Sequence, residues 1–522
     1  MKSPYPLFVS ERLPLQDHCG IVAAFASQDT PFFPSALNGL RVLQTRGYDG
    51  AGFCALDSLG RVYQHKGIGM VNEVFSQSVQ QTLIPTMARV WICQVRYGTN
   101  GGFIPDNVQP FIDYHKLSGE PFMVAHNGQF SASVNEKQTA FSDTQLFTKR
   151  LGSALEKTWD DRIVHILQNT RGAWSLAIGT KDALYVARDP YGFRPLTYGH
   201  IWNETKNQFI WVAASETSAL DAMGAADIFE LLPGGIAKIT ENGLTLLTKT
   251  EKHKRALCIF ENIYIHHGAG RAHLPRTNQR AIRKSPTVDD IRRRCGKILA
   301  REAPLTYRDV DIVVGVPGTG IEGGMVYARS LDLPYFQAIS DAATNLTEQR
   351  TFMTADIDSI YQKVLKHFRF DIQSLKNRRV VLVDDSIVRG NIAKGLIFLL
   401  KTHYHVPTVH MRVLSPPIDK SCHLGVNTRT NKELIAARLD GDVERIRLEF
   451  GAESLAYLSA HGLKEAITGD PKATGFCMGC MAGHRPPIDA YGNSVTLLKH
   501  TPRPITHVPT LIREPAFSAE AL

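Results

Sequence analysis

The sequence contains no apolar run near the roughly 20 residues that a membrane-spanning helix needs, and a local candidate such as residues 395–400 is far too short. The first 18 residues include charged side chains and prolines but no continuous apolar core, so they lack the pattern of a signal peptide. Cysteine is scarce, with 8 in 522 residues, which does not suit a disulfide framework. These absences predict a protein with no membrane segment, in a reducing compartment such as the cytoplasm.

Neither sign of charge is strongly in excess, since 59 Lys and Arg face 50 Asp and Glu, for a net charge of +9. That surplus would suit an anionic partner such as a phosphorylated substrate, and a solvated surface explains it equally well. The basic run Arg292-Arg293-Arg294 lacks the interleaved aromatic residues of a single-strand binder, so we expect no nucleic-acid partner. With 43% apolar and 21% charged residues, the composition is that of a globular protein with two or three domains.

Cys19 stands at the head of an apolar, strand-like run, residues 20–25. If the chain is cut before Cys19, the thiol and a free α-amine share one residue, and the amine can act as general base. The amine titrates at roughly 7.7–8.0 and a free thiol at roughly 8.5, so both are poised near neutral pH. This interpretation makes residues 1–18 a pro-segment. The alternative for an isolated cysteine is a small core residue.

Four further segments carry the groups that a glutamine site needs. Glutamine presents a carboxylate, an α-ammonium and an amide carbonyl, so its site requires a fixed cation, a fixed anion and donors aimed at an oxyanion. The segments are LQTRGYDGAG at 43–52, QVRYGT at 94–99, AHNG at 125–128 and SDT at 142–144. Together with Cys19, and in this order, they resemble the class II glutamine amidotransferases, whose glutaminase domain belongs to the N-terminal-nucleophile hydrolases.

The resemblance implies a role for each polar residue of these segments. Cys19 would attack the glutamine amide, Arg96 would hold the α-carboxylate and Asp143 the α-ammonium. Arg46 would shape the floor of the pocket. The alternative for Arg96 and Asp143 is that they are ordinary surface charges.

The same resemblance implies an oxyanion hole made by the side chain of Asn127 and the backbone N–H of Gly128. As a dipeptide, Asn127-Gly128 is also a strong hairpin-turn signal. The sequence departs from the family at Gln94, where many relatives carry His before the Val-Arg-Tyr step.

From Asp311 the pattern changes to strand, loop and helix units. Residues 311–317 predict a buried strand, followed by a helix from Ile321 to about Leu331. Residues 380–383 predict a second buried parallel strand, with two carboxylates at its C-terminal end, where open α/β sheets bind ligands. Apolar residues at 392, 396, 399 and 400 predict that the next helix packs on the sheet with its N-terminus facing an anion.

Residues 380–390 resemble the phosphoribosyl diphosphate (PRPP) motif of the type I phosphoribosyltransferases. The resemblance implies that Asp384 and Asp385 bind the ribose hydroxyls and help to place Mg²⁺. The loop from Ser386 through Arg389 to Gly390 would surround the 5′-phosphate. The alternative is a strand that ends in solvated acids.

Three departures fall in this half of the chain. Where the family has two or three hydroxyl residues after the Arg-Gly step, this chain has Asn391, Ile392 and Ala393, and a hydrogen bond to a charged group contributes roughly 1.5–3 kcal/mol. Gly318 replaces an acidic residue after the Val-Pro step. The family's catalytic loop, with its Lys-Asn-Arg-Tyr stretch, is replaced at residues 342–348, and only Arg350-Thr351-Phe352 remain.

From Cys19 to about Pro486, the whole chain resembles the amidophosphoribosyltransferase family. The implied fold class is α/β: an α+β N-terminal-nucleophile sandwich with αββα layers, then a parallel-sheet phosphoribosyltransferase domain. The implied domains are a pro-segment at 1–18, a glutaminase domain at 19–255, a phosphoribosyltransferase-type domain at 256–480 and a C-terminal tail at 481–522.

The implied function is hydrolysis of glutamine and transfer of ammonia to C1 of PRPP, the first step of purine biosynthesis. The departures leave two alternatives open: a paralogue that delivers ammonia to another phosphorylated acceptor, and a non-catalytic regulator that keeps both folds. The resemblance also implies a homo-oligomer.

Four of the cysteines form a possible metal-ligand set. Cys477 and Cys480 make a C-x₂-C pair, which alone is ambiguous between zinc, redox chemistry and no function, and Cys258 and Cys422 are lone cysteines in apolar surroundings. The resemblance to cluster-bearing amidophosphoribosyltransferases implies that these four hold a [4Fe–4S] cluster, with zinc or no metal as the alternatives. The cysteines at 54, 93 and 295 are expected to be buried apolar residues.

Overall fold

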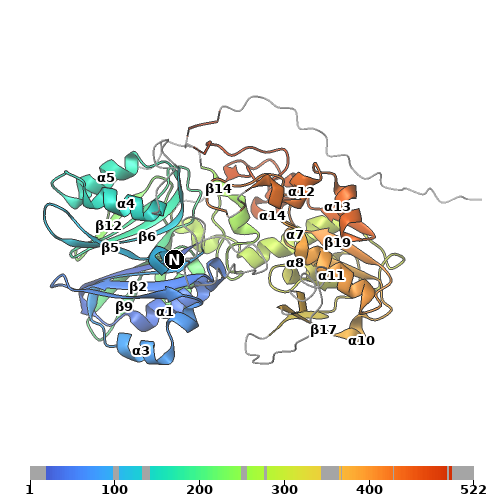
Figure 1. The fold of residues 1–522 in the computed structure, drawn as a ribbon, viewed down its shortest axis with the longest axis horizontal. Coiled ribbons are helices and arrows are strands. Elements are labelled where there is room, and N and C mark those ends of the chain that lie inside the picture. Colours follow the sequence, from blue (N-terminus) through green and yellow to red (C-terminus); the bar gives the residue numbers. More distant parts are fainter. Residues whose placement is uncertain are drawn as a thin grey trace, which may run out of the picture.

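The structure is a computed structural model that describes residues 19–97, 105–131, 142–248, 255–275, 279–342, 364–365, 367–426, 428, 430–490 and 493–495. Two lobes lie side by side (Figure 1). The blue to green lobe contains two antiparallel sheets, and the yellow to red lobe contains a parallel sheet. The predicted pro-segment, residues 1–18, lies outside the described residues. None of the described helices is long and apolar enough to cross a membrane.

The first lobe is a sandwich of two antiparallel sheets. The seven-stranded sheet has the order β11 (Ala226–Glu230), β9 (Thr197–Asn203), β10 (Gln208–Ala214), β1 (Gly20–Thr30), β4 (Ala88–Arg96), β2 (Gly50–Leu56), β3 (Val62–Ile68). The six-stranded sheet has the order β13 (Gly243–Leu246), β12 (Ile236–Thr240), β8 (Leu184–Arg188), β7 (Gly172–Thr180), β6 (Pro121–Phe130), β5 (Phe111–Tyr114).

Three apolar clusters hold the layers of this sandwich together. Side chains of both sheets fill the space between them. On its outer face the seven-stranded sheet packs against α1 (Phe33–Val42), α2 (Val71–Val74), α3 (Gln77–Leu83) and α6 (Thr217–Ala222). The outer face of the six-stranded sheet packs against α4 (Asp143–Gly152) and α5 (Trp159–Gln168). The predicted αββα order of layers is confirmed.

Strand β1 shows why an uninterrupted apolar run forms a strand here. Successive side chains of a strand point to opposite faces. Ile21, Ala23 and Phe25 therefore face the second sheet, while Val22 and Ala24 face the helices. Because both faces are covered, every position of the run is apolar.

The second lobe is built on a four-stranded parallel sheet in the order β15 (Ile312–Gly315), β18 (Val380–Asp384), β19 (Val409–Val413), β20 (Ser454–Tyr457). One face packs against α7 (Val288–Glu302), α8 (Gly320–Ser330) and α14 (Ala460–Thr468). The other packs against α11 (Asn391–Thr402), α12 (Ile435–Arg438) and α13 (Val443–Phe450). A small antiparallel pair, β16 (Ile339–Asp341) and β17 (Phe368–Phe370), precedes α10 (Ile372–Leu375). The predicted parallel-sheet domain is confirmed.

The last described part of the chain, from β21 (Phe476–Cys477) on, lies at the junction between the lobes. Strand β14 (Leu257–Cys258) pairs in parallel with β21 (Phe476–Cys477), which places Cys258 opposite Cys477. Beyond β21, Met481 and Ile488 are buried in apolar clusters. The predicted C-terminal tail therefore begins with packed residues, and the domain boundaries themselves stay a prediction.

Candidate active sites

Cys19 lies directly before β1, beside the C-terminal end of the neighbouring strand β4. Gly20 pairs with Val95, and the Cys19 thiol contacts the carbonyl of Tyr97 at 3.9 Å. Burial raises the pKa of the thiol above its ordinary value, while the bond to Tyr97 and the charge of Arg96 oppose that shift. The thiol is therefore protonated at neutral pH and requires a base to become a nucleophile.

Arg46 is fully buried next to Cys19. Its Nε donates to the carbonyl of Cys19 at 3.2 Å, and its two terminal nitrogens contact Glu216 at 2.7 Å and Glu261 at 3.0 Å. Burial alone would lower the pKa of Arg46, but the two carboxylates outweigh burial and raise that pKa. Arg46 thus fixes the backbone of Cys19, and its predicted place in the floor of a glutamine pocket stays a prediction.

Arg96 comes from a strand and Asp143 from a helix, and both act electrostatically on Cys19. Arg96 ends β4 and is 6% exposed. Burial lowers its pKa, and the charges of Cys19, Asp49 and Asp143 oppose that shift. Asp143 begins α4, and its carboxylate accepts hydrogen bonds from the backbone N–H groups of Phe130 at 3.1 Å and Thr144 at 2.7 Å. The structure therefore gathers a thiol, a cation and an anion, which are groups that a glutamine site would need.

Asn127 and Gly128 lie inside strand β6, paired with Ser175 and Trp174 of β7, so the hairpin-turn alternative is wrong. Gly128 has φ +134°, and a Cβ there would lie 2.0 Å from the carbonyl oxygen of Ala173. Only glycine fits this position. The buried Asn127 side chain donates to Ser215 Oγ at 3.4 Å.

Ser215 was not among the residues predicted for the site. Its hydroxyl also accepts the backbone N–H of Ile21 at 3.0 Å, so it connects Asn127 to the strand that follows the nucleophile. Ser215 directly follows β10, and the pairing of β10 with β1 brings it to this place.

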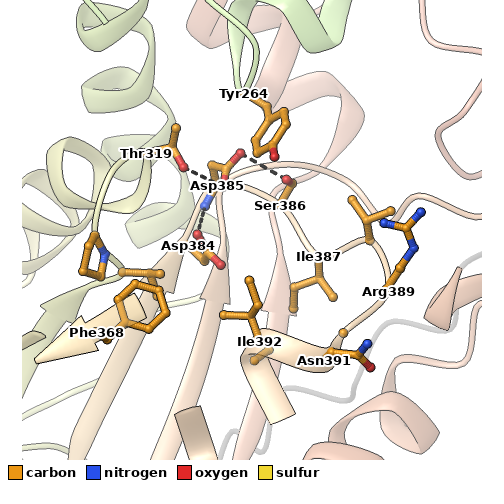
Figure 2. A pocket seen from close by; sticks show the side chains of 15 residues that line it. Tyr264, Thr319, Phe368, Asp384, Asp385, Ser386, Ile387, Arg389, Asn391 and Ile392 are labelled. Atoms are coloured by element: carbon orange, nitrogen blue, oxygen red, sulfur yellow. Dashed lines mark hydrogen bonds between the residues drawn. The ribbon is translucent and has the colours of Figure 1, made fainter. Parts of the chain in front are cut away.

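A second site lies at the C-terminal end of β18. A cavity of about 170 Å³ there is lined by residues of the loop between β18 and α11, together with Tyr264, Thr319 and Phe368. Figure 2 shows these side chains. Thr319 and Ser386 donate to the two oxygens of Asp385 at 2.8 and 3.0 Å. Thr319 and Tyr264 are therefore lining residues that the sequence did not single out.

The two carboxylates of this cavity repel each other. Burial and the neighbouring charge of Asp385 raise the pKa of Asp384 well above its usual range, and burial raises that of Asp385 as well. A carboxylate pair in this state gains most from a cation, which would let both groups ionise.

The predicted phosphate loop has an unusual wall. Gly390 has φ +83° and precedes α11, whose first residues are Asn391, Ile392 and Ala393. Ile387 and Ile392 line the cavity. The wall is therefore apolar where the family has hydroxyl residues, and the N-terminus of α11 remains as the feature that favours an anion.

Arg389 is paired with a residue that was not predicted for the site. Its Nη2 lies 2.6 Å from Glu433 Oε2, and both side chains are partly exposed. An incoming phosphate would therefore compete with a carboxylate for this cation.

The diphosphate segment differs from the family as the sequence indicates. Gly318 has φ +88°, and an added Cβ would meet nothing within 4 Å, so space is not the reason for glycine there. Ala342 is hydrogen-bonded to the carbonyl of His367. The rest of the altered loop, residues 343–348, and Arg350-Thr351-Phe352 lie outside the described residues.

The four candidate ligand cysteines converge on one small cavity of about 30 Å³, lined by Cys258, Cys422, Cys477 and Cys480. Burial raises the pKa of Cys258 to about 12 and also raises the pKa values of Cys477 and Cys480. The backbone N–H of Leu424 donates to the Cys422 sulfur at 3.3 Å. Among the described residues, no three His, Cys, Asp or Glu side chains form a group that could hold one metal ion. The other predicted buried cysteines, 54, 93 and 295, are at most 1% exposed.

Comparison with known proteins covers nearly the whole chain. A family profile described as a glutamine amidotransferase domain matches residues 104–222. Curated amidophosphoribosyltransferases from Synechococcus elongatus and Homo sapiens are each 32% identical, over 90% and 88% of this chain and 92% and 90% of their own lengths. A third, from Archaeoglobus fulgidus, is 32% identical over 90% of this chain.

Solved structures agree with the curated relatives. The glutamine PRPP amidotransferase from B. subtilis, complexed with ADP and GMP, is 30% identical with a TM-score of 0.76 and covers 91% of this chain. A structure titled as the allosteric regulatory enzyme of purine biosynthesis gives the same identity and TM-score, and 98% of its chain is matched. Given this similarity in sequence and fold, together with the paired sites, the chain belongs to the amidophosphoribosyltransferase family.

Proposed function

We propose that this protein is a glutamine-dependent amidophosphoribosyltransferase that makes 5-phosphoribosylamine, glutamate and diphosphate from glutamine and PRPP, the first step of purine biosynthesis. The observation that carries the proposal is the convergence of Cys19, Arg96, Asp143 and the Asn127-Gly128 pair in one lobe of a chain whose other lobe ends β18 in a carboxylate pair. The relatives' shared name supports this function over the paralogue and the regulator.

In the first half-reaction, Arg96 would bind the α-carboxylate of glutamine and Asp143 its α-ammonium. The α-amine of a mature Cys19 would take the thiol proton, and the thiolate would attack the amide carbon. The Asn127 side chain and the Gly128 N–H would stabilise the oxyanion. Collapse of the intermediate releases ammonia, and water then hydrolyses the thioester to free glutamate.

In the second half-reaction, ammonia would attack C1 of PRPP, and the C1–O bond to diphosphate would break. Asp384 and Asp385 would hold the ribose hydroxyls, and the 5′-phosphate would lie at the N-terminus of α11, in the loop from Ser386 through Arg389 to Gly390. A divalent cation such as Mg²⁺ fits the buried carboxylate pair and would neutralise charge that develops on the leaving diphosphate.

We further propose a [4Fe–4S] cluster on the four converging cysteines. The donor set fits, because four thiols surround one cavity and a backbone N–H already points at Cys422. When bound, the cluster would tie Cys477 and Cys480 near the chain's end to Cys258 at the junction of the lobes.

The decisive experiment is a steady-state assay of anaerobically purified protein with glutamine, PRPP and Mg²⁺. We expect glutamate and diphosphate to form in equal amounts. A Cys19→Ala variant should lose both products with glutamine yet still release diphosphate when supplied with ammonia. Glutamate without diphosphate would point to another acceptor, and neither product from the mature protein would point to the regulator.

Maturation and metal content are tested on the same preparation. Intact mass should show a chain that begins at Cys19, and an active enzyme that retains residues 1–18 would contradict the proposed base. Metal analysis should give about four irons per chain, lost in Cys477→Ser, as the four-thiolate site requires. One zinc per chain would overturn the cluster. Homo-oligomerisation and a cytoplasmic location stay proposals, and light scattering tests the first.

A further inference from the structure

Two buried glutamines hold the main chain next to the oxyanion hole. The backbone N–H of His126 donates to Gln109 Oε1 at 2.7 Å, and Gln94 Nε2 donates to the His126 carbonyl at 3.1 Å. Gln94 is fully buried, Gln109 is 6% exposed and His126 2%. His126 directly precedes Asn127. Side chains therefore hold both the N–H and the carbonyl of the residue next to Asn127.

The strand pairing of β6 explains why side chains, and not a neighbouring strand, bond to the main chain of His126. Strand β5 pairs with β6 only as far as Val124, opposite Phe111. Beyond that point, His126 has a strand partner on one side only, at Leu176 of β7. A buried main-chain group without a partner would be costly, so the two amides take the place of the missing strand.

The Gln94 bond also joins the two sheets of the sandwich. Gln94 lies on β4, paired with Ile21 of β1, two residues before Arg96. His126 lies on β6 of the other sheet. The nucleophile and the oxyanion hole stand on different sheets. The hydrogen bond from Gln94 to His126 joins these two sheets one residue from Asn127, and it therefore sets the distance between the nucleophile and the oxyanion hole.

A further set of bonds extends from His126 to the predicted ammonium site. Thr144 Oγ1 lies 3.0 Å from His126 Nδ1, 3.3 Å from Gln109 Nε2 and 3.2 Å from Asp143 Oδ1. Burial lowers the pKa of His126 to about 4, so the ring is neutral at physiological pH and adds no competing charge beside Asp143.

We propose that Gln94 is a positioning residue for the glutaminase reaction: its amide holds β6 so that Asn127 and Gly128 meet the oxyanion. This gives a physical account of the departure at position 94, because a histidine ring N–H could donate to the same carbonyl. The inference deepens the proposed function and rests on it.

The test compares Gln94→Met and Gln94→His with the wild-type protein. Loss of an oxyanion-hole donor itself costs about 10²–10³ in kcat, so we expect an indirect loss of about tenfold for Gln94→Met. The KM for glutamine should change less than about twofold, because ground-state contacts remain. Diphosphate release with ammonia should stay at the wild-type rate, and Gln94→His should recover most of kcat.

Gln208→Met is the matched control. Gln208 is a buried glutamine of the same lobe, 8% exposed, and its amide donates to Thr30 Oγ1 at 2.9 Å, in β1 and away from Cys19. Its loss should lower stability and leave kcat unchanged. A fall in kcat that is equal in both methionine variants, or a parallel fall in the ammonia reaction, would show a purely structural role and overturn the proposal.

Hydrogen exchange separates this inference from the proposed function. In Gln94→Met, the amides of residues 122–130 should exchange faster than in the wild-type protein, and this measurement needs no activity. If wild-type protein releases no glutamate, the proposed function fails. If exchange in 122–130 is unchanged, Gln94 does not hold the strand, whatever the activity.

Discussion

Glu261→Gln should weaken the junction between the two lobes. Glu261 lies in the 3-10 helix at Ile259–Asn262, and its carboxylate contacts Arg46 at 3.0 Å, Arg194 at 3.3 Å and His266 at 2.9 Å. Arg194 also donates to the carbonyl of Leu424, next to the cysteine cavity. The buried carboxylate of Glu261 therefore connects Arg46, which holds the Cys19 carbonyl, to the loop that carries Cys422 and Leu424.

The magnitude follows from burial. Arg46 is fully buried and Arg194 is 1% exposed, so neither guanidinium can turn to water when the charge of Glu261 is removed. Removing one partner of a buried ion pair typically costs about 3–5 kcal/mol. Arg46 keeps Glu216 at 2.7 Å, so we expect a value near the lower end, about 3 kcal/mol.

An exposed ion pair of the same chain provides the control. Arg301 and Glu465 lie 2.8 Å apart, with side chains 62% and 31% exposed. Such surface pairs contribute about 0–1 kcal/mol, so Glu465→Gln should be nearly neutral.

Scanning calorimetry measures both variants. For domains of this size, each kcal/mol shifts Tm by about 2–4 °C, so Glu261→Gln should lower it by about 6–12 °C. Glutamine hydrolysis should fall as well, because Arg46 holds the Cys19 carbonyl. Equal Tm values for Glu261→Gln and Glu465→Gln would refute the reasoning, since burial would then not matter.

Two further predictions test other parts of the structure. Gly128→Ala should abolish most glutaminase activity, and it should add an overpacking cost of about 1–3 kcal/mol to the cost of its positive φ, because its Cβ would clash with Ala173. Gly60→Ala, at φ +82° with open space, should show only the cost of the left-handed backbone, about 1–2 kcal/mol. Urea unfolding compares the two variants, and equal losses would contradict the clash with Ala173. Burial lowers the pKa of His410 from 6.5 to about 4. Between these pH values the imidazole binds a proton in the unfolded chain and not in the folded chain, so the free energy of unfolding falls as the pH drops from 6.5 towards 4. His410→Asn should make that fall shallower when unfolding midpoints at pH 7 and pH 5 are compared, and parallel falls would contradict the cause.

The order of the sequence motifs was enough to predict the family and both folds. Local patterns carry this information: an apolar run after Cys19, and four apolar residues before Asp384, each form strands with two covered faces. Asn127 and Gly128 lie in strand β6. This strand is compatible with their predicted role in a site, and it is not compatible with a hairpin turn at these two residues. The three residues that would contact glutamine directly through charge and nucleophilicity are gathered as expected.

Several functional neighbours could not be found in this way. Tyr264 and Thr319 reach the second cavity from segments far from Asp385, and Glu433 meets Arg389 from 44 residues away. Each contact depends on how helices and loops return to the sheet, and no local periodicity encodes that path. The same holds for Gln109, whose amide bonds to a part of β6 that lacks a strand partner on this side because β5 begins only at Phe111.

By itself, the sequence determined which residues can do chemistry: a thiol before an apolar strand, carboxylates after another, and four cysteines that form a possible metal-ligand set. Only the tertiary structure decided which of them share a site. It gave Arg46 two buried carboxylates, placed Glu433 against Arg389, and set Gln94 against the chain beside Asn127. The physical reason is that residue type and local pattern fix chemical capacity and secondary structure, whereas partners distant in sequence meet only when burial of the shared apolar cores brings the sheets together.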